Sequence, residues 1–294
     1  MPGALYVIST PIGNLEDITL RALRLLGEVD LIACEDTRHT RKLLAHFQIS
    51  TPTISYHEHN ERPRAAELIA RLQAGLSVAL VSDAGTPLVS DPGYRIVQEA
   101  IAHDIQVVPV PGASALVAAL TASGLQTDEF YFAGFLPAKS SQRRARLAAL
   151  AGVETTLIFY EAPHRIKEAL ADARAALGNR QCVLARELTK LHEEFIRGTL
   201  DEVCAMMQQG EARGELVLLV GPLTKDAATA DQEVPRSIAD EVAALMRDER
   251  LDRKAALKRV ARARGLSKSA AYRRLMAERM AEDVPVEVTP DDVE

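Results

Sequence analysis

Short apolar runs alternate with amphipathic segments through the first part of the chain. Runs such as residues 4–10 and 77–83 are rich in aliphatic and β-branched side chains, which is typical of buried strands. Segments such as residues 64–75 and 93–104 repeat apolar residues at helical spacing. This alternation is typical of an α/β fold with a largely parallel sheet, and it predicts a first α/β domain over residues 1–112.

A second series of apolar runs begins near residue 129 and continues to residue 221. Residues 181–187 and 193–200 are two strand-like runs with no helical segment between them, which indicates a mixed or antiparallel portion. We therefore expect a second α/β domain over residues 113–224. Residues 225–235 have the composition of a linker.

Charge separates the rest of the chain from this body. The 294 residues carry a formal net charge of -6, but residues 236–279 hold thirteen Lys or Arg against six Asp or Glu, so this segment carries +7 and the remainder -13. We expect residues 236–280 to form a small, basic, all-helical domain. Residues 281–294 hold six acids and two prolines, the composition of a disordered acidic tail.

Cysteine content and hydropathy exclude several classes of protein. The three cysteines lie far apart and form no CxxC pair, so neither a disulfide framework nor a zinc site is indicated, and a reducing cytoplasm is the expected location. The first ten residues lack the features of a signal peptide, and no apolar run is long enough to span a bilayer. We expect no role in a membrane.

Four loops rich in Gly, Pro and Asp follow predicted strands, where ligands of open α/β sheets bind. Their sequences are TPIGN, EDTR, DAGTP and PGASA. None of the motifs GxGxxG, GxxxxGK[ST], HExxH or GxSxG occurs, so the usual signatures of dinucleotide, nucleoside triphosphate, zinc and serine hydrolase sites are missing.

Together with YHEHNE, FAGFLP and YEAPHRI, these loops resemble the tetrapyrrole-methylase superfamily of S-adenosylmethionine enzymes. TPIGNL, EDTR, HNE and PHRI are most similar to its branch that methylates a ribose 2'-oxygen in small-subunit ribosomal RNA. The resemblance spans roughly residues 5–221. It implies two α/β domains with the cofactor in the cleft between them, S-adenosylmethionine as cofactor, a homodimer, and a cytidine of 16S ribosomal RNA, cytidine 1402, as substrate.

The residue types in DAGTP and PGASA suit that cofactor. An aspartate at a strand end accepts hydrogen bonds from ammonium or hydroxyl groups, glycine permits close approach of the backbone, and free N–H groups at a helix start suit a carboxylate. The expected cofactor-binding residues are Pro11, Asp83, Gly85, Thr86, Ser114 and Ala115. For Asp91 in SDPG we expect a structural role, as the N-cap of a helix with Pro92 at its first position.

Methyl transfer from a sulfonium is a direct displacement that needs no metal, and we expect no metal site. A general base would remove the hydroxyl proton. The catalytic candidates are Glu35, Asp36, Arg38, Asn60 and Glu161. The sequence does not decide which acid is the base, and Asp36 with Thr37 is also compatible with a helix cap. The candidates for RNA contact in the body are Arg38, His57, His164 and Arg165.

Within the basic segment, Ala261, Gly265 and Ala271 have the spacing of a helix-turn-helix. The cations expected to contact RNA phosphates there are Arg262, Lys268, Arg273 and Arg274. A helical bundle that aids dimerisation is the alternative for this domain. For the whole protein, a tetrapyrrole methyltransferase or a DNA-binding regulator that senses a ligand remain alternatives to an enzyme acting on the small ribosomal subunit.

Overall fold

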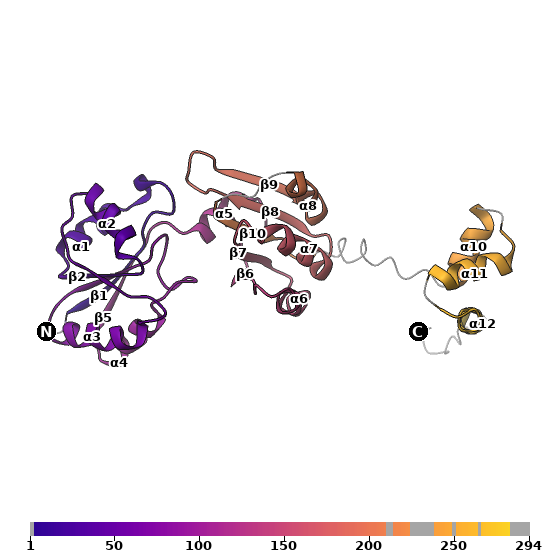
Figure 1. Ribbon diagram of the computed structural model, residues 1–294, viewed down its shortest axis with the longest axis horizontal. Coiled ribbons are helices and arrows are strands. Elements are labelled where there is room, and N and C mark those ends of the chain that lie inside the picture. The colour runs from indigo at the N-terminus through magenta and orange to yellow at the C-terminus, as the bar shows by residue number, and fades with distance from the viewer. Residues whose placement is uncertain (1–2, 210–213, 224–237, 249–250, 264–265, 283–294) are drawn as a thin grey trace, which may run out of the picture. The chain divides into compact units, whose positions relative to one another are not determined.

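The computed structural model describes residues 3–209, 214–223, 238–248, 251–263 and 266–282 (Figure 1). The chain divides into two compact units, Met1–Ala227 and Ala228–Glu294. The first unit holds two five-stranded sheets, and the second is a helical unit. Within the described residues, no helix is both long and apolar enough to cross a membrane.

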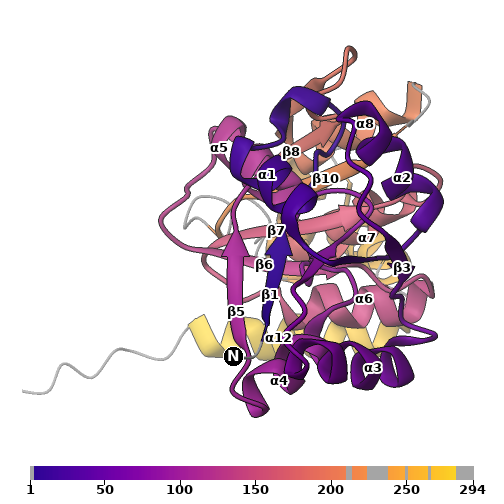
Figure 2. The ribbon, with the colours of Figure 1, turned by 90° about the vertical axis from the view of Figure 1, so that its left-hand side faces the viewer.

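The first sheet is entirely parallel, as the alternating pattern predicts. Its strands, in spatial order, are β3 (Thr53–Ser55), β2 (Leu31–Cys34), β4 (Val78–Val81), β1 (Ala4–Ile8) and β5 (Gln106–Val110). Figure 2 shows β1 and β5 side by side. Every residue of β2 and β4 is buried, because helices cover both faces of the sheet.

Four helices supply that cover, and their bounds are α1 (Leu20–Glu28), α2 (Thr37–His46), α3 (Glu61–Gln73) and α4 (Tyr94–Ala102). Leu68 and Leu72 of α3 and Ile96 of α4 pack in one core with Leu5 and Leu80 of the sheet. Side chains of α1 belong to a second core, formed with the alternate set of strand residues. Because successive strand residues point to opposite faces, the two cores lie on opposite faces of this sheet.

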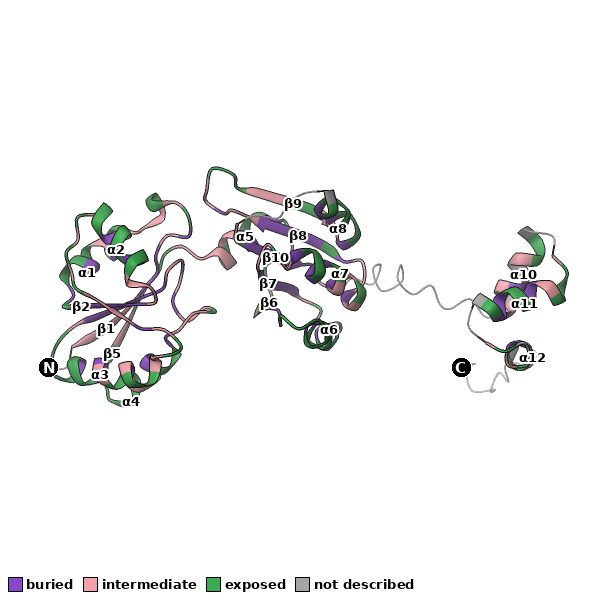
Figure 3. Ribbon diagram, in the orientation of Figure 1, coloured by how far each residue is buried: buried purple, intermediate pink, exposed green. Residues whose placement is uncertain are grey.

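The second sheet is mixed, as expected. Its order is β6 (Phe130–Phe135), β7 (Thr156–Glu161), β10 (Leu216–Val220), β8 (Gln181–Arg186) and β9 (Glu194–Thr199). The β6–β7 pair is parallel and the other pairs are antiparallel. Its central strands are almost completely buried (Figure 3).

Helix α5 (Ala115–Ser123) packs with strands of this second sheet through Ala119 and Leu120. The other helices of this half are α6 (Ser140–Ala149), α7 (Ile166–Leu177) and α8 (Leu200–Gln209), which contribute to a separate core. The expected boundary at residues 112 and 113 therefore falls between the end of β5 and the start of α5.

The second unit contains α10 (Ile238–Asp248), α11 (Arg253–Ala263) and α12 (Lys268–Glu282). Ala261 and Ala271 are buried in its core, as the helix-turn-helix spacing predicts, and Ser267 caps α12 through the amide of Ala270. Gly265, the expected linker and most of the expected tail lie outside the described residues. Since α12 continues to Glu282, the helical unit extends two residues beyond the expected end at residue 280.

Candidate active site

Thr86 connects three of the loops that are rich in Gly, Pro and Asp. Its hydroxyl lies 2.9 Å from that of Ser9 and donates to the carbonyl of Ala113 at 3.1 Å. Thr10 and Gly85 exchange two backbone hydrogen bonds, of 2.8 and 3.1 Å. The loops that follow β1, β4 and β5 therefore form one hydrogen-bonded assembly, because parallel strands present their carboxyl ends at the same edge of the sheet.

Two glycines make this assembly possible. Gly85 has φ of +80°, a left-handed conformation that side chains disfavour, and a Cβ there would lie 3.2 Å from Cγ2 of Ile12. At Gly112, a Cβ would lie only 3.0 Å from the Cβ of Ser9. Ser114 follows as the N-cap of α5, although its side chain makes no capping hydrogen bond.

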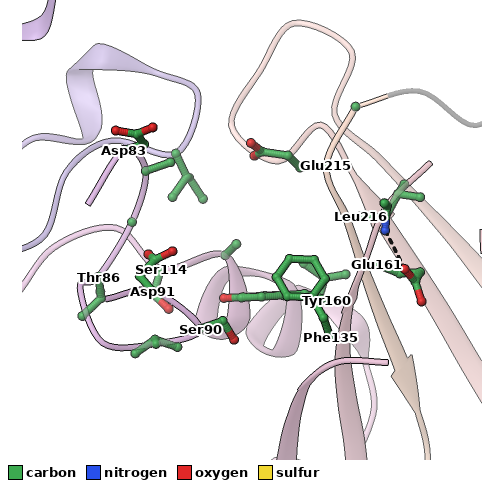
Figure 4. Close-up of a pocket in the computed structure, with 18 of the residues that line it drawn as sticks. Asp83, Thr86, Ser90, Asp91, Ser114, Phe135, Tyr160, Glu161, Glu215 and Leu216 are labelled. Carbon is green, nitrogen blue, oxygen red and sulfur yellow. Dashed lines mark hydrogen bonds between the residues drawn. The ribbon is translucent and has the colours of Figure 1, made fainter. Parts of the chain in front are cut away.

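A cavity of about 360 Å³ opens between these loops and the second sheet (Figure 4). This volume lies within the range of sites for small ligands. The residues lining it from the first half are Ile12, Asp83, Ala84, Gly85, Thr86, Val89, Ser90 and Asp91. Those from the second half are Ser114, Ala115, Phe135, Tyr160, Glu161, Ala162, Pro163, Gly214, Glu215, Leu216 and Val217.

The lining has a strong charge bias. Four of its side chains are carboxylates, and none of the described lining residues is Lys, Arg or His. A partly enclosed cavity with this lining favours a cation, because opposite charges attract more strongly where water is excluded. S-adenosylmethionine carries a sulfonium and an ammonium group, and its adenine suits apolar side chains of the lining such as Ile12, Phe135 and Val217. The lining therefore fits the expected cofactor.

Of the expected cofactor-binding residues, Asp83, Gly85, Thr86, Ser114 and Ala115 line this cavity. Pro11 does not line it, but its neighbour Ile12 does. Asp83 is held in place by the backbone amide of Asp36, which donates to its Oδ1 at 3.1 Å. The DAGTP loop is thus connected to the EDTR loop through the carboxylate that faces the cavity.

Glu161 is the one expected catalytic residue that lines the cavity. Its side chain is fully buried, accepts a hydrogen bond from the amide of Ala162 at 2.8 Å, and pairs with Arg165 at 2.7 Å. Arg165 also donates to the carbonyl of Leu136 at 2.6 Å, so its guanidinium is directed into the protein. This placement does not support direct RNA contact by Arg165, whereas the neighbouring His164 is exposed.

The EDTR residues lie outside the cavity lining. Asp36 caps α2 by accepting from the amide of Arg38 at 2.8 Å, and the exposed Arg38 guanidinium pairs with the same carboxylate at 2.7 Å. The hydrogen bonds from Arg38 lower the pKa of Asp36. Burial, with Asp83 and Glu58 nearby, raises the pKa of Glu35. The helix-cap interpretation of Asp36 is confirmed, and the catalytic roles of this group stay predictions.

In the HNE loop, the side chain of Asn60 forms hydrogen bonds with neighbouring residues. Its Oδ1 accepts from the amide of His57 at 2.9 Å, and its Nδ2 lies 3.2 Å from both the carbonyl of Ser55 and Nε2 of His57. Glu61 has a structural role that the sequence did not indicate, because its Oε1 accepts from the hydroxyl of Tyr56 and the amide of Gly93. Asn60 and His57 shape this loop, and Glu61 anchors the SDPG segment to it.

The expected role of Asp91 as a helix cap is wrong. Helix α4 begins at Tyr94 and its N-cap is Gly93, with φ of +137°. Asp91 instead lines the cavity. Burial raises the pKa of Asp91 to about 6, with contributions from the acids Glu35, Asp83 and Glu215 and with Ser82 acting in the opposite direction.

Sequence reasoning also missed the opposite wall of the cavity. The hydroxyl of Tyr160 accepts from the amide of Leu116 at 3.2 Å, and its ring contacts that of Phe135 with centroids 5.6 Å apart. Burial raises the pKa of Tyr160. The fourth carboxylate, Glu215, is largely exposed and lies 4.0 Å from Nζ of Lys190. An aromatic inside a strand is typical of any core, so nothing in the local sequence marks Tyr160.

The expected RNA-binding cations of the second unit are partly described. Arg262, Arg273 and Arg274 are exposed. Lys268 opens α12, and its side chain is not among the parts that the structure describes. Exposed Tyr272 lies between Ala271 and the two arginines. In the described part of the chain, no group of three His, Cys, Asp or Glu side chains is arranged to hold a metal ion.

Comparison with known proteins agrees with this geometry. The model of the tetrapyrrole (corrin/porphyrin) methylases matches residues 4–204. The chain is 48% identical to ribosomal RNA small subunit methyltransferase I of Synechocystis sp., over 94% of this chain and 93% of that protein. It is 50% identical to the protein of the same name from Vibrio cholerae, over 92% and 93% of the two chains.

Among solved structures, it is similar in fold to uroporphyrin-III C-methyl transferase from Thermus thermophilus complexed with S-adenyl homocysteine. The TM-score is 0.53 and the identity 22%, covering 74% of this chain and 97% of the other. The chain belongs to the tetrapyrrole (corrin/porphyrin) methylases, and within them to the family of ribosomal RNA small subunit methyltransferase I.

Proposed function

We propose that the protein methylates the 2'-oxygen of a cytidine ribose in 16S ribosomal RNA. Its family consists of methyltransferases, and S-adenosylmethionine is the methyl donor. The observation that carries the proposal is the acid-lined cavity formed by the loops that tie together at Thr86, in a chain about half identical to proteins named for the small ribosomal subunit.

The methyl donor supplies an electrophilic methyl carbon when bound. The protein's own contribution is alignment, and holding two reactants in line is worth roughly 7 to 11 kcal/mol. Asp83 is positioned to accept from a hydroxyl or ammonium group, while Gly85 brings the backbone close. The N–H groups at the start of α5 suit a carboxylate, since helix N-termini carry partial positive charge. No step of this chemistry requires a metal ion.

The second unit supports RNA as the substrate. Residues 236–279 carry a net charge of +7, and Arg262, Arg273 and Arg274 extend into solvent rather than into the core. Cations on a small helical unit bind phosphates mainly by releasing counterions, without a need for duplex geometry. A methyltransferase acting on a small tetrapyrrole has no use for such a surface.

We also propose a homodimer, with a second copy of this chain as partner. Helix α5 has the sequence ALVAALTAS, which is mostly apolar on every side, although only one side packs on the second sheet. Val117 on this helix is 50% exposed. A helix that is apolar on every side is normally buried on every side, so a second chain accounts for the exposed part. Sedimentation of the purified protein tests this, and a monomer across micromolar concentrations would contradict it.

Labelled methyl transfer tests the proposed activity. Small ribosomal subunits that lack the modification should accept label from S-adenosylmethionine, and a tetrapyrrole should not. Label on a tetrapyrrole, or tight binding to a DNA operator without any transfer, would instead favour the alternative functions. The free thiols of buried Cys34 and Cys182 agree with the proposed cytoplasmic location.

A further inference from the structure

The four carboxylates that line the cavity differ in their hydrogen bonds and ion pairs within the protein, and they are Asp83, Asp91, Glu161 and Glu215. The amide of Asp36 donates to Asp83. Glu161 is neutralised by Arg165. Glu215 is 72% exposed and lies near Lys190. Of these four described carboxylates, only Asp91 combines partial burial with neither an ion pair to Lys, Arg or His nor a hydrogen bond from a backbone amide.

We propose that Asp91 is the general base, the carboxylate that accepts the proton of the ribose 2'-hydroxyl during methyl transfer. The inference rests on the proposed function and names the group that the sequence leaves undecided. The acids that the sequence suggested as catalytic candidates, Glu35, Asp36 and Glu161, are not given this role. Glu161 is less suited to it because its side chain is fully buried and one of its oxygens, Oε1, already pairs with Arg165.

The segment that carries Asp91 is fixed by its surroundings. Gly93, two residues later, donates its amide to Glu61 at 3.2 Å and packs so tightly that a Cβ would lie 2.8 Å from Leu80. Leu88 and Ser90 both have left-handed φ values, of 72° and 68°. Non-glycine residues adopt this conformation at a cost, and such strain concentrates at functional sites. The loop therefore holds Asp91 at the cavity wall opposite Tyr160 (Figure 4).

The surroundings of Asp91 also suit it to accept a proton near neutral pH. The groups around it are Glu35 after β2, Ser82 and Asp83 after β4, Tyr160 on β7 and Glu215 before β10. Burial and these acids raise the pKa of Asp91 to about 6. A base works best when its pKa lies close to the working pH, because it is then both ionised and basic enough.

The proton and electron balance of the step is simple. The 2'-oxygen forms a bond to the methyl carbon while the carbon–sulfur bond breaks, and that electron pair stays on sulfur. The hydroxyl proton passes to a carboxylate oxygen of Asp91, which later releases it to solvent. No oxidant, reductant or further reactant is required.

The test compares Asp91→Asn and Asp91→Glu with the wild-type protein in single turnovers on small subunits. Asp128→Asn, an exposed acid-to-amide change, is the matched control. Asp91→Asn should lower the rate about 100- to 10,000-fold, and Asp91→Glu should restore part of it. Calorimetry should show S-adenosylmethionine affinity within about tenfold of wild type, so that the loss is in kcat rather than KM.

The pH profile separates a base from a structural residue. The wild-type rate should fall about tenfold per pH unit below pH 6, and Asp91→Asn should lose this dependence. Carboxyl 13C NMR of the wild-type protein should give Asp91 a pKa well above that of an exposed aspartate. A near-normal rate for Asp91→Asn, an unchanged pH slope in that variant, or an ordinary pKa for Asp91 would overturn the inference. If wild-type protein methylates no ribosomal RNA, the proposed function itself fails.

Discussion

The carboxylate of Glu161 and the guanidinium of Arg165 form an ion pair of 2.7 Å at the wall of the cavity. The pair joins the last residue of β7 to the turn before α7, and a backbone carbonyl of Leu136 accepts from the same guanidinium. Both partners come from the YEAPHR motif. These contacts keep one wall of the cavity in shape and direct the Arg165 guanidinium into the protein.

Removing one partner of this pair should cost more than the pair itself contributes. Arg165→Met leaves the buried carboxylate of Glu161 without a counter-charge, which typically destabilises a protein by about 3 to 5 kcal/mol. Adding Glu161→Gln should restore a large part of this loss. Arg24→Met is the matched control, because Arg24 and Glu28 are also four residues apart and 2.7 Å apart, but exposed, so less than about 1 kcal/mol is expected. Equal losses in urea unfolding of Arg165→Met and Arg24→Met would contradict this account.

The DAGTP loop should determine cofactor affinity. Asp83→Ala removes an acceptor that faces the cavity, and Gly85→Val forces a β-branched side chain into a left-handed position 3.2 Å from Ile12. We expect each variant to weaken S-adenosylmethionine binding at least about tenfold by calorimetry, equivalent to about 1.4 kcal/mol. Far-UV circular dichroism should remain unchanged. Undiminished affinity in both variants would place the cofactor elsewhere.

The parts of this site that the sequence predicted are those where one backbone requirement allows few residue types. Gly85 has a left-handed φ, and a Cβ at Gly112 would lie 3.0 Å from the Cβ of Ser9. Both positions therefore favour glycine, and both loops can be recognised as sequence motifs. Asp91 was misassigned because Asp-Pro-Gly is equally compatible with a helix start, and only the position of Gly93 excludes it. Tyr160 lies on β7 and Glu215 directly precedes β10, both in the half that holds the other sheet, and their approach to the cavity depends on tertiary structure.

Asp91 should make stability depend on pH. Its pKa is about 6 in the folded protein and near 3.8 in the unfolded protein, so the folded state binds the proton more tightly than the unfolded state does. The stability gained from this protonation is present at low pH and is lost as pH rises through 6. Asp91→Asn should therefore be more stable than wild type at pH 8, by roughly 1 kcal/mol after allowance for solvent screening. The difference should shrink towards pH 4 in urea titrations. A variant less stable than wild type at pH 8 would argue that the charged carboxylate is well accommodated.

The basic unit, residues 236–279, should contribute much of the affinity for RNA. A protein ending at residue 234 should bind S-adenosylmethionine normally, because the cavity lies in the first unit. Its RNA affinity should fall, and the slope of log affinity against log salt should flatten by a few units, at about 0.7 to 0.9 for each phosphate that is no longer neutralised. Arg262→Ala and Arg273→Ala should each reduce the slope by about one. A changed molecular mass with an unchanged slope would instead identify the unit as a dimerisation bundle.

Methylation of a ribose oxygen of 16S ribosomal RNA is the activity that we propose for this protein. Nucleoside mass analysis tests it most directly, on RNA from unmodified small subunits incubated with S-adenosylmethionine and either wild-type protein or Asp83→Ala. We expect 2'-O-methylcytidine at a single position with wild-type protein, and far less with the variant. Methylation of a base rather than a ribose, or the absence of any new methylated nucleoside with wild-type protein, would contradict it.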